Sequence, residues 1–116
     1  MPAGSKSVPV DKYTISHNFG SLAINTILCY YHGASVGMIG FYPKGQAPVS
    51  VLLGTGVFTI FLEIEKYLDI IETFRYEKPI YVQFSWDDKN YIKNGSLSTQ
   101  LEPIGEQEGS GVPPTT

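Results

Sequence analysis

The sequence predicts an α+β domain, an antiparallel and curved sheet of five to seven short strands with one main helix, about residues 63–75, packed on one face. Segments rich in β-branched and aromatic residues recur between Gly, Pro and Asn turn signals, which is typical of strands. A single apolar stripe at helical spacing follows the fifth of these segments. At 116 residues the chain is about one domain, long enough to bury a core without disulfides.

Composition divides the chain into three parts. Residues 1–10 are rich in Pro, Gly and Ser, and we expect them to be disordered. Residues 11–104 hold the periodic segments and form the single α+β domain. Residues 105–116 are acidic and then rich in Gly, Ser and Pro, which predicts a disordered tail.

The first half of the domain predicts strands separated by turns. Glycine at 33 accepts a positive φ, so His32-Gly33 indicates a hairpin turn, and glycine inside the following strand, at Gly37, indicates a bend or a close backbone approach. The expected strands are Lys12–His17, Ser21–Tyr31, Ser35–Tyr42 and Val49–Leu53.

The segment from Val57 to Leu62 fits either a strand or the first turns of a helix that starts at Thr55. We favour a strand, because charges begin only at Glu63. The charge-free stretch 47–62 is interrupted by Pro and Gly and is shorter than the ~20 residues of a membrane-spanning helix. We therefore predict two strands joined by a Gly-Thr-Gly turn, and no membrane span.

The helix predicted after this strand has one apolar face, and the charged residues at its two ends suit the helix dipole. Glu63 and Glu65 suit its positive N-terminus, and Arg75 suits its C-terminus. It should end near Tyr76, because the residue before Pro79 is pushed out of the α region. The apolar stripe consists of Ile64, Tyr67, Leu68, Ile71 and Phe74.

The segment Ile80–Trp86 alternates apolar and polar residues, which predicts a strand with one buried and one wet face. Asn94-Gly95 is a strong hairpin signal and predicts that Tyr91–Lys93 pairs with Ser96–Leu101. The wet face and the loop that leaves it are the candidate binding surface, which consists of Tyr81, Gln83, Ser85, Asp87 and Asp88.

Few residues suit catalysis or metal binding. The soft metal ligands are His17, Cys29 and His32, fewer than the four of a structural zinc site, and no acid near Cys29 in sequence would orient a base. Asp87 and Asp88 are adjacent, so on an extended chain they face opposite ways. We assign no catalytic residue, no metal ligand and no cofactor.

Charge and cysteine content indicate the setting and the partners. Charged residues make up 16% of the chain, below the roughly 25% of an average domain, which favours self-association, with a dimer as the first expectation. The net charge is −3 and the 8 basic residues are scattered, which disfavours nucleic acid as a partner. A single cysteine and an N-terminus without a signal-like apolar segment predict a cytoplasmic protein.

Two resemblances add to this interpretation. Glu77-Lys78-Pro79-Ile80-Tyr81, followed by Glu102-Pro103-Ile104-Gly105-Glu106, resembles a family of small uncharacterised bacterial proteins, notably cyanobacterial, with no assigned activity; the resemblance spans roughly residues 57–108. The strand running directly into a helix over Phe58–Phe74 is similar to the PC4 and whirly single-stranded DNA-binding fold, which implies dimerisation and nucleic-acid binding on a curved sheet.

The leading hypothesis is therefore a non-enzymatic binding or assembly module that acts as a homo-oligomer. The alternative is a single-stranded nucleic-acid-binding protein of PC4-like fold, although the basic strand positions that such proteins use are missing. A third reading is a small enzyme that uses Cys29 and His32.

Overall fold

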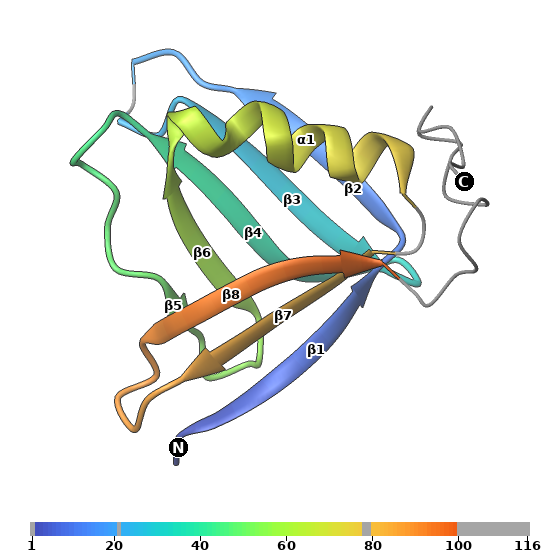
Figure 1. Cartoon of the computed structure of the whole chain (residues 1–116), viewed down its shortest axis with the longest axis vertical. Coiled ribbons are helices and arrows are strands. Elements are labelled where there is room, and N and C mark those ends of the chain that lie inside the picture. Colours follow the sequence, from blue (N-terminus) through green and yellow to red (C-terminus); the bar gives the residue numbers. More distant parts are fainter. Residues whose placement is uncertain (1, 21, 78–79, 100–116) are drawn as a thin grey trace, which may run out of the picture.

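The computed structural model describes residues 2–20, 22–77 and 80–99 and shows an α+β arrangement of two sheets and one principal helix (Figure 1). A 3-10 turn, η1 (Ile64–Lys66), leads into the helix α1 (Tyr67–Tyr76). The strands are β1 (Gly4–Val10), β2 (Lys12–His17), β3 (Asn25–Tyr31), β4 (Ala34–Tyr42), β5 (Val51–Leu52), β6 (Phe58–Glu63), β7 (Ile80–Trp86) and β8 (Ile92–Thr99).

The strands form two sheets, so the prediction of one antiparallel sheet is wrong. β1, β7 and β8 make an antiparallel sheet of three strands, and the other sheet has the order β2-β3-β4-β6-β5. Within the larger sheet β4 and β6 are parallel, with Gly37 opposite Phe58. The parallel pair arises because the long connection after β4 returns the chain to the end at which β4 began (Figure 1).

The N-terminal segment corrects a second expectation, since residues 1–10 were expected to be disordered. Gly4–Val10 pairs along its whole length with Ile80–Trp86. Val8 and Val10 are buried in the core, at 5% and 3% exposure, whereas the alternate residues face outward. Ordering the segment costs chain entropy, and its Pro and Ser residues bury too little apolar surface to offset that cost. The burial of the two valines does offset it.

Backbone hydrogen bonds tie the two sheets together at two corners. The Asp11 amide donates to the Tyr30 carbonyl at 2.9 Å where β1 turns into β2. On the opposite side, the Leu52 amide donates to the Asn90 carbonyl and the Ile92 amide to the Ser50 carbonyl, both at 2.8 Å. The sheets are thereby held face to face across one core.

That core is aliphatic and aromatic and draws on both sheets. Phe58 of β6 and Phe84 of β7 meet across it, with ring centroids 5.6 Å apart. Its buried members are Val8, Val10, Ile27, Cys29, Ile39, Phe41, Leu52, Phe58, Ile71, Phe74, Ile80, Val82 and Phe84.

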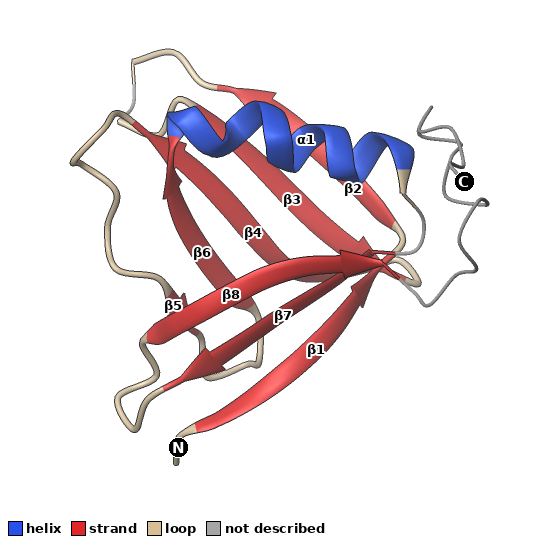
Figure 2. Cartoon of the chain, in the orientation of Figure 1, coloured by secondary structure: helices blue, strands red, loops and turns tan. Residues whose placement is uncertain are grey.

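The helix covers one face of the five-stranded sheet, as predicted (Figure 2). Phe74 packs against Tyr13 of β2, and Tyr67 meets Phe41 of β4 edge to face, with centroids 5.3 and 5.1 Å apart. The segment that fitted strand or helix is a strand, Phe58–Glu63, because β4 lies beside it and pairs with its backbone. No helix in the described part of the chain is long and apolar enough to cross a membrane.

The hairpin predicted at Asn94-Gly95 is wrong, because both residues lie within β8. The reversal occurs at residues 87–91, where the Asn90 amide donates to the Asp87 carbonyl at 3.0 Å and Asn90 adopts φ 68°. A turn there lets β8 pair with all of β7 and places Leu97 opposite Val82. The longer ladder with core contacts is favoured over a short hairpin supported by turn chemistry alone.

Two predictions about glycine and turns are confirmed. His32 and Gly33 both have positive φ, 52° and 83°, and reverse the chain between β3 and β4. At Gly37 the ring of Phe58, its partner on the parallel strand β6, lies over the backbone, so that a Cβ would overlap the ring. Only glycine fits there without displacing a buried aromatic side chain.

Candidate functional site

The outer face of the three-stranded sheet carries the candidate site, and strand pairing sets its layout. Residues directly opposite one another in antiparallel strands point to the same face. The outward residues of β1, β7 and β8 therefore form three rows of three, which we call the neutral grid. The rows are Ser5, Ser85 and Asn94; then Ser7, Gln83 and Ser96; then Pro9, Tyr81 and Ser98.

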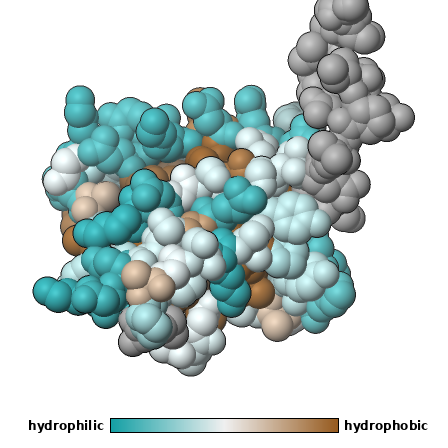
Figure 3. Space-filling view, turned by 60° about the horizontal axis from the view of Figure 1, so that its bottom comes forward, coloured by the Kyte–Doolittle hydropathy of each residue, from teal (hydrophilic) through white to brown (hydrophobic). Residues whose placement is uncertain are grey.

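The neutral grid has no charged member and is rich in hydroxyl and amide groups. Two weak contacts bridge neighbouring strands, Asn94 Nδ2 donating to Ser85 Oγ and Ser96 Oγ donating to Gln83 Oε1, each at 3.4 Å. Its first two rows, together with Lys6, Phe84 and Gly95, line a shallow open depression of about 650 Å³. The face turned forward in Figure 3 is mostly hydrophilic or neutral, with hydrophobic atoms confined to narrow seams.

The structure separates the predicted surface residues into two groups. Gln83 is exposed and Tyr81 and Ser85 are half-buried, all on the outer side of β7. Asp87 and Asp88 lie beyond the strand, in the turn that leads to β8. The three strand residues thus share a face with each other and with β1 and β8, whereas the two aspartates do not extend the grid.

Asp87 uses its carboxylate to hold the turn. Its Oδ1 accepts hydrogen bonds from the Lys89 and Tyr91 amides at 2.9 and 3.0 Å, and its Oδ2 lies 3.6 Å from Lys93 Nζ. The Tyr91 amide, followed by the Lys89 amide and the Lys93 ammonium, lowers the pKa of Asp87 below its ordinary value. These contacts assign Asp87 a structural role in the turn.

Sequence reasoning missed most of the neutral grid. Ser5 and Ser7 fall in the segment expected to be disordered, and Asn94 and Ser96 fall at the hairpin expected within β8. A signal for the first pair exists, because residues 5–10 alternate between small polar or Pro residues and the run Lys6, Val8, Val10. The second pair becomes visible only with the register of β7 and β8.

The His and Cys residues that could bind a soft metal ion do not lie together. Cys29 is buried in the core, and burial raises the pKa of its thiol from 9.0 to about 12. His32 is exposed in its turn and stacks on Tyr31, and His17 Nδ1 lies 2.8 Å from Asn25 Oδ1. Within the described residues, no three His, Cys, Asp or Glu side chains are arranged to hold a metal ion.

Comparisons of the chain with protein-family models, with curated proteins and with solved structures find no match.

Proposed function

We propose that the protein is a non-enzymatic binding or assembly module of the cytoplasm that acts as a homo-oligomer, in the simplest case a dimer, through its neutral grid. The observation that carries the proposal is the uniform chemistry of this face. All but one of its nine residues have a side chain that both donates and accepts hydrogen bonds, the exception being Pro9.

Such a face suits a second copy of itself. In a two-fold interface the same patch meets itself, so every charge would meet a like charge. A grid without charges avoids that repulsion, and groups that both donate and accept can pair with identical groups. Gln83 lies at the centre of the grid, so a two-fold axis through the centre brings it against its own copy.

The size of the face predicts weak association. Strands about 4.8 Å apart and rows roughly 7 Å apart give the grid an area of roughly 300 Å² per protomer. A stable interface buries about 800 Å² per partner. We therefore expect a reversible dimer that forms at high protein concentration rather than an obligate one.

The two alternative functions have less support. A nucleic-acid site of stacking aromatic residues needs cations along the backbone track, and the neutral grid has none. Several of the aromatic side chains are engaged in internal ring contacts, among them Tyr13, Phe41 and Tyr67. An enzyme based on Cys29 would need a thiolate, which the raised pKa of the buried thiol opposes.

Sedimentation velocity from about 10 µM to high micromolar concentration tests the proposal. We expect the weight-average sedimentation coefficient to rise with concentration, and a strict monomer throughout would contradict the proposal. A labelled oligonucleotide at 50 mM salt addresses the nucleic-acid alternative, since a salt-dependent shift would favour that function instead.

Substitutions at the centre of the grid make the test specific. Gln83→Lys places a charge against its own copy and should abolish association, whereas Thr14→Lys, at an exposed position of β2, should not. Mixing the Gln83→Lys and Gln83→Glu proteins should restore association, because opposite charges then meet. Equal association by the Gln83→Lys and wild-type proteins would exclude this face as the interface.

A further inference from the structure

A second site lies between the two sheets and is lined by residues of β6, β8 and α1 among others. Figure 1 shows how these three elements are arranged. The site is a partly open cavity of about 190 Å³ between the two sheets. Ile39 and Val82 are fully buried at its floor, at 2% and 1% exposure. Half-buried aliphatic residues form its walls, namely Ile60 and Leu62 of β6, Ile70 of α1 and Leu97 of β8.

The inner part and the rim of the cavity differ in polarity. Its floor and the walls just named are aliphatic, so its depth offers dispersion contacts and no hydrogen bonds. Its rim is polar and includes Ser50, Asn94 and Ser96. Of the described residues that line the cavity, Lys93 alone carries a charge. The Lys93 ammonium lies 3.6 Å from Asp87 Oδ2 in the neighbouring turn, an exposed contact that an incoming anion can share or displace. An apolar cavity with this cation at its rim complements an amphiphile with an anionic head.

The remaining edge of β8 frames the same opening. β8 pairs with β7 on one side, and on the other, among the described residues, only its first residue, Ile92, donates a backbone hydrogen bond to the loop before β5. Gly95 lies at the mouth of the cavity, opposite the inward-facing Phe84. The absence of a side chain at this point leaves the mouth open beside Lys93.

We propose that this cavity binds the aliphatic chain of a fatty acid, with the carboxylate at the rim beside Lys93. An apolar cavity of about 150 Å³ accepts benzene, so one of 190 Å³ holds a chain of roughly six to eight carbons. The cavity shares Asn94 and Ser96 with the neutral grid, but Gln83 at the centre of the grid does not line it, so this proposal does not depend on self-association.

The length of the ligand chain gives the sharpest test. Titration calorimetry with butanoate, hexanoate, octanoate and decanoate, each below its micelle concentration, should give one site per chain. Affinity should rise about fourfold for every methylene, since each contributes roughly 0.8 kcal/mol on burial, until the cavity is full near eight carbons. No saturable binding of octanoate, or a gain that continues unchanged beyond decanoate, would overturn the proposal.

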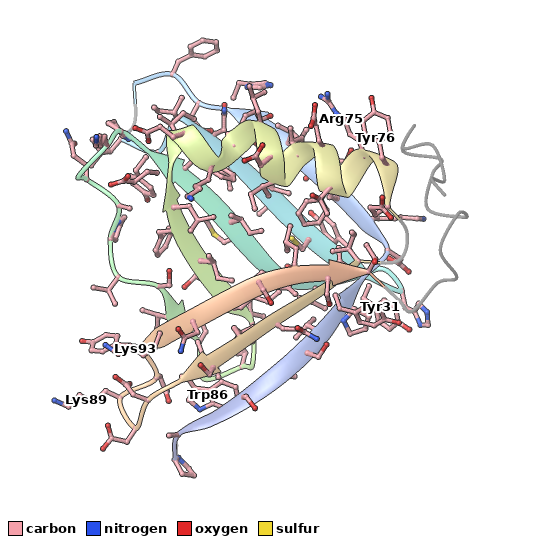
Figure 4. The ribbon with its side chains drawn as sticks, viewed as in Figure 1. Tyr31, Arg75, Tyr76, Trp86, Lys89 and Lys93 are labelled. Carbon is pink, nitrogen blue, oxygen red and sulfur yellow. The ribbon has the colours of Figure 1, made fainter. Side chains whose placement is uncertain are left out.

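Two lysines of one hairpin provide a matched pair for the carboxylate (Figure 4). Lys93→Gln should weaken octanoate about two- to fivefold and leave octanol unchanged, because Lys93 is exposed and already lies 3.6 Å from Asp87 Oδ2, so that an ion pair with the ligand contributes little more. Lys89, at the tip of the turn, does not line the cavity, so Lys89→Gln should leave both ligands unchanged. Equal effects of the two variants would exclude Lys93 as the partner of the carboxylate.

Filling the cavity tests the position of the chain. A Cβ at Gly95 would meet only ordinary contacts, with the Gln83 carbonyl at 3.5 Å and Phe84 Cβ at 3.9 Å, so Gly95→Val should fold and weaken octanoate roughly tenfold. Ile60→Trp should do the same from the opposite wall, whereas Leu22→Trp, on the exposed β2–β3 loop, should not. Unchanged binding in the folded Gly95→Val and Ile60→Trp proteins would place octanoate elsewhere and contradict the assignment.

Discussion

The interior between the two sheets has two unlike ends. At the aromatic end, Phe58 and Phe84 pack together, and the Phe58 ring covers Gly37 of β4 so closely that no larger residue fits there. At the aliphatic end, two residues further along the same parallel pair, Ile39 lies opposite Ile60 and the walls enclose the cavity. The same two strands thus form both a tightly filled region and a hollow one.

The difference follows from side-chain size at equivalent positions. Large rings directed inward from both sheets fill the space at the aromatic end, whereas Ile and Leu from the same strands reach less far and leave a void. A void loses contacts and costs stability unless something occupies it. The aromatic end therefore holds the sheets in place, and the aliphatic end keeps space for a ligand.

The largest expected effect is the protection of Cys29, which lies opposite Gly37 at the aromatic end. Its thiol is fully buried and its pKa is about 12, so a thiol reagent at pH 8 should reach it only when the fold opens. We expect modification on the order of 10³-fold or more slower than in urea-unfolded protein. Absorbance of released thionitrobenzoate measures the rate.

Fast modification of the folded protein would show that the aromatic end opens locally. It would contradict the tighter packing of this end. A pH series gives an independent check. Between pH 9 and 12 the unfolded thiol loses its proton while the folded one keeps it, so stability should fall as pH rises through that range. A Cys29→Ala protein should lose that part of the fall.

Truncation of one residue at each end should give unequal losses of stability. Phe84→Ala removes a ring that is 3% exposed and in contact with both Phe58 and Trp86, so we expect a loss of about 3–5 kcal/mol. Ile60→Ala, beside the existing void, should cost near the low end of its class, about 2 kcal/mol. Urea denaturation measures both, and equal losses would mean that the two ends are equally well packed.

The elements that sequence reasoning identified correctly are those with strong local periodicity. The alternation of Ile80–Trp86, the end of the helix at Tyr76 and the His32-Gly33 turn each depend on residues close together in the chain. Elements that depend on distant partners were missed. β1 becomes a strand only because Val8 and Val10 pack beside Ile80–Trp86, seventy or more residues away.

The candidate site divides in the same way. Gln83 and Ser85 were predicted because one strand carries the alternation, but the neutral grid needs the registers of three strands. The cavity was not predicted at all, since its lining combines residues of β4, β6, β7, β8 and α1. The Asn94-Gly95 signal led to a wrong prediction, because the turn propensity of a few residues stabilises less than strand pairing that buries side chains in the core.

A single methyl group at the aromatic end should have the next largest effect. Gly37→Ala places a Cβ on the Phe58 ring, and we expect a loss of about 1–3 kcal/mol from the forced repacking. Phe58→Leu in the same chain frees that space, so the two losses should be less than additive in a double-mutant cycle. Additive losses would contradict a direct contact between residues 37 and 58.

The smallest effect is expected at the turn that follows the aromatic end, where Asp87 accepts two backbone hydrogen bonds and lies beside Lys93. Asp87→Ala should lower the urea midpoint by less than Gly37→Ala does, and Asp87→Asn by less again, because the amide keeps one acceptor oxygen.

The pKa of Asp87 is lowered in the folded state, chiefly by the Tyr91 amide, so its contribution is complete above the ordinary pKa of 3.8 and is lost as pH falls through the depressed value. The difference between wild-type and Asp87→Ala midpoints should therefore be constant near neutral pH and shrink as the pH falls below 3.8. Asp88, the exposed neighbour of Asp87, gives the control, and Asp88→Ala should shift the urea midpoint little at any pH. If Asp88→Ala and Asp87→Ala shift the midpoint equally, the negative charge of the turn, and not the hydrogen bonds of Asp87, stabilises the turn.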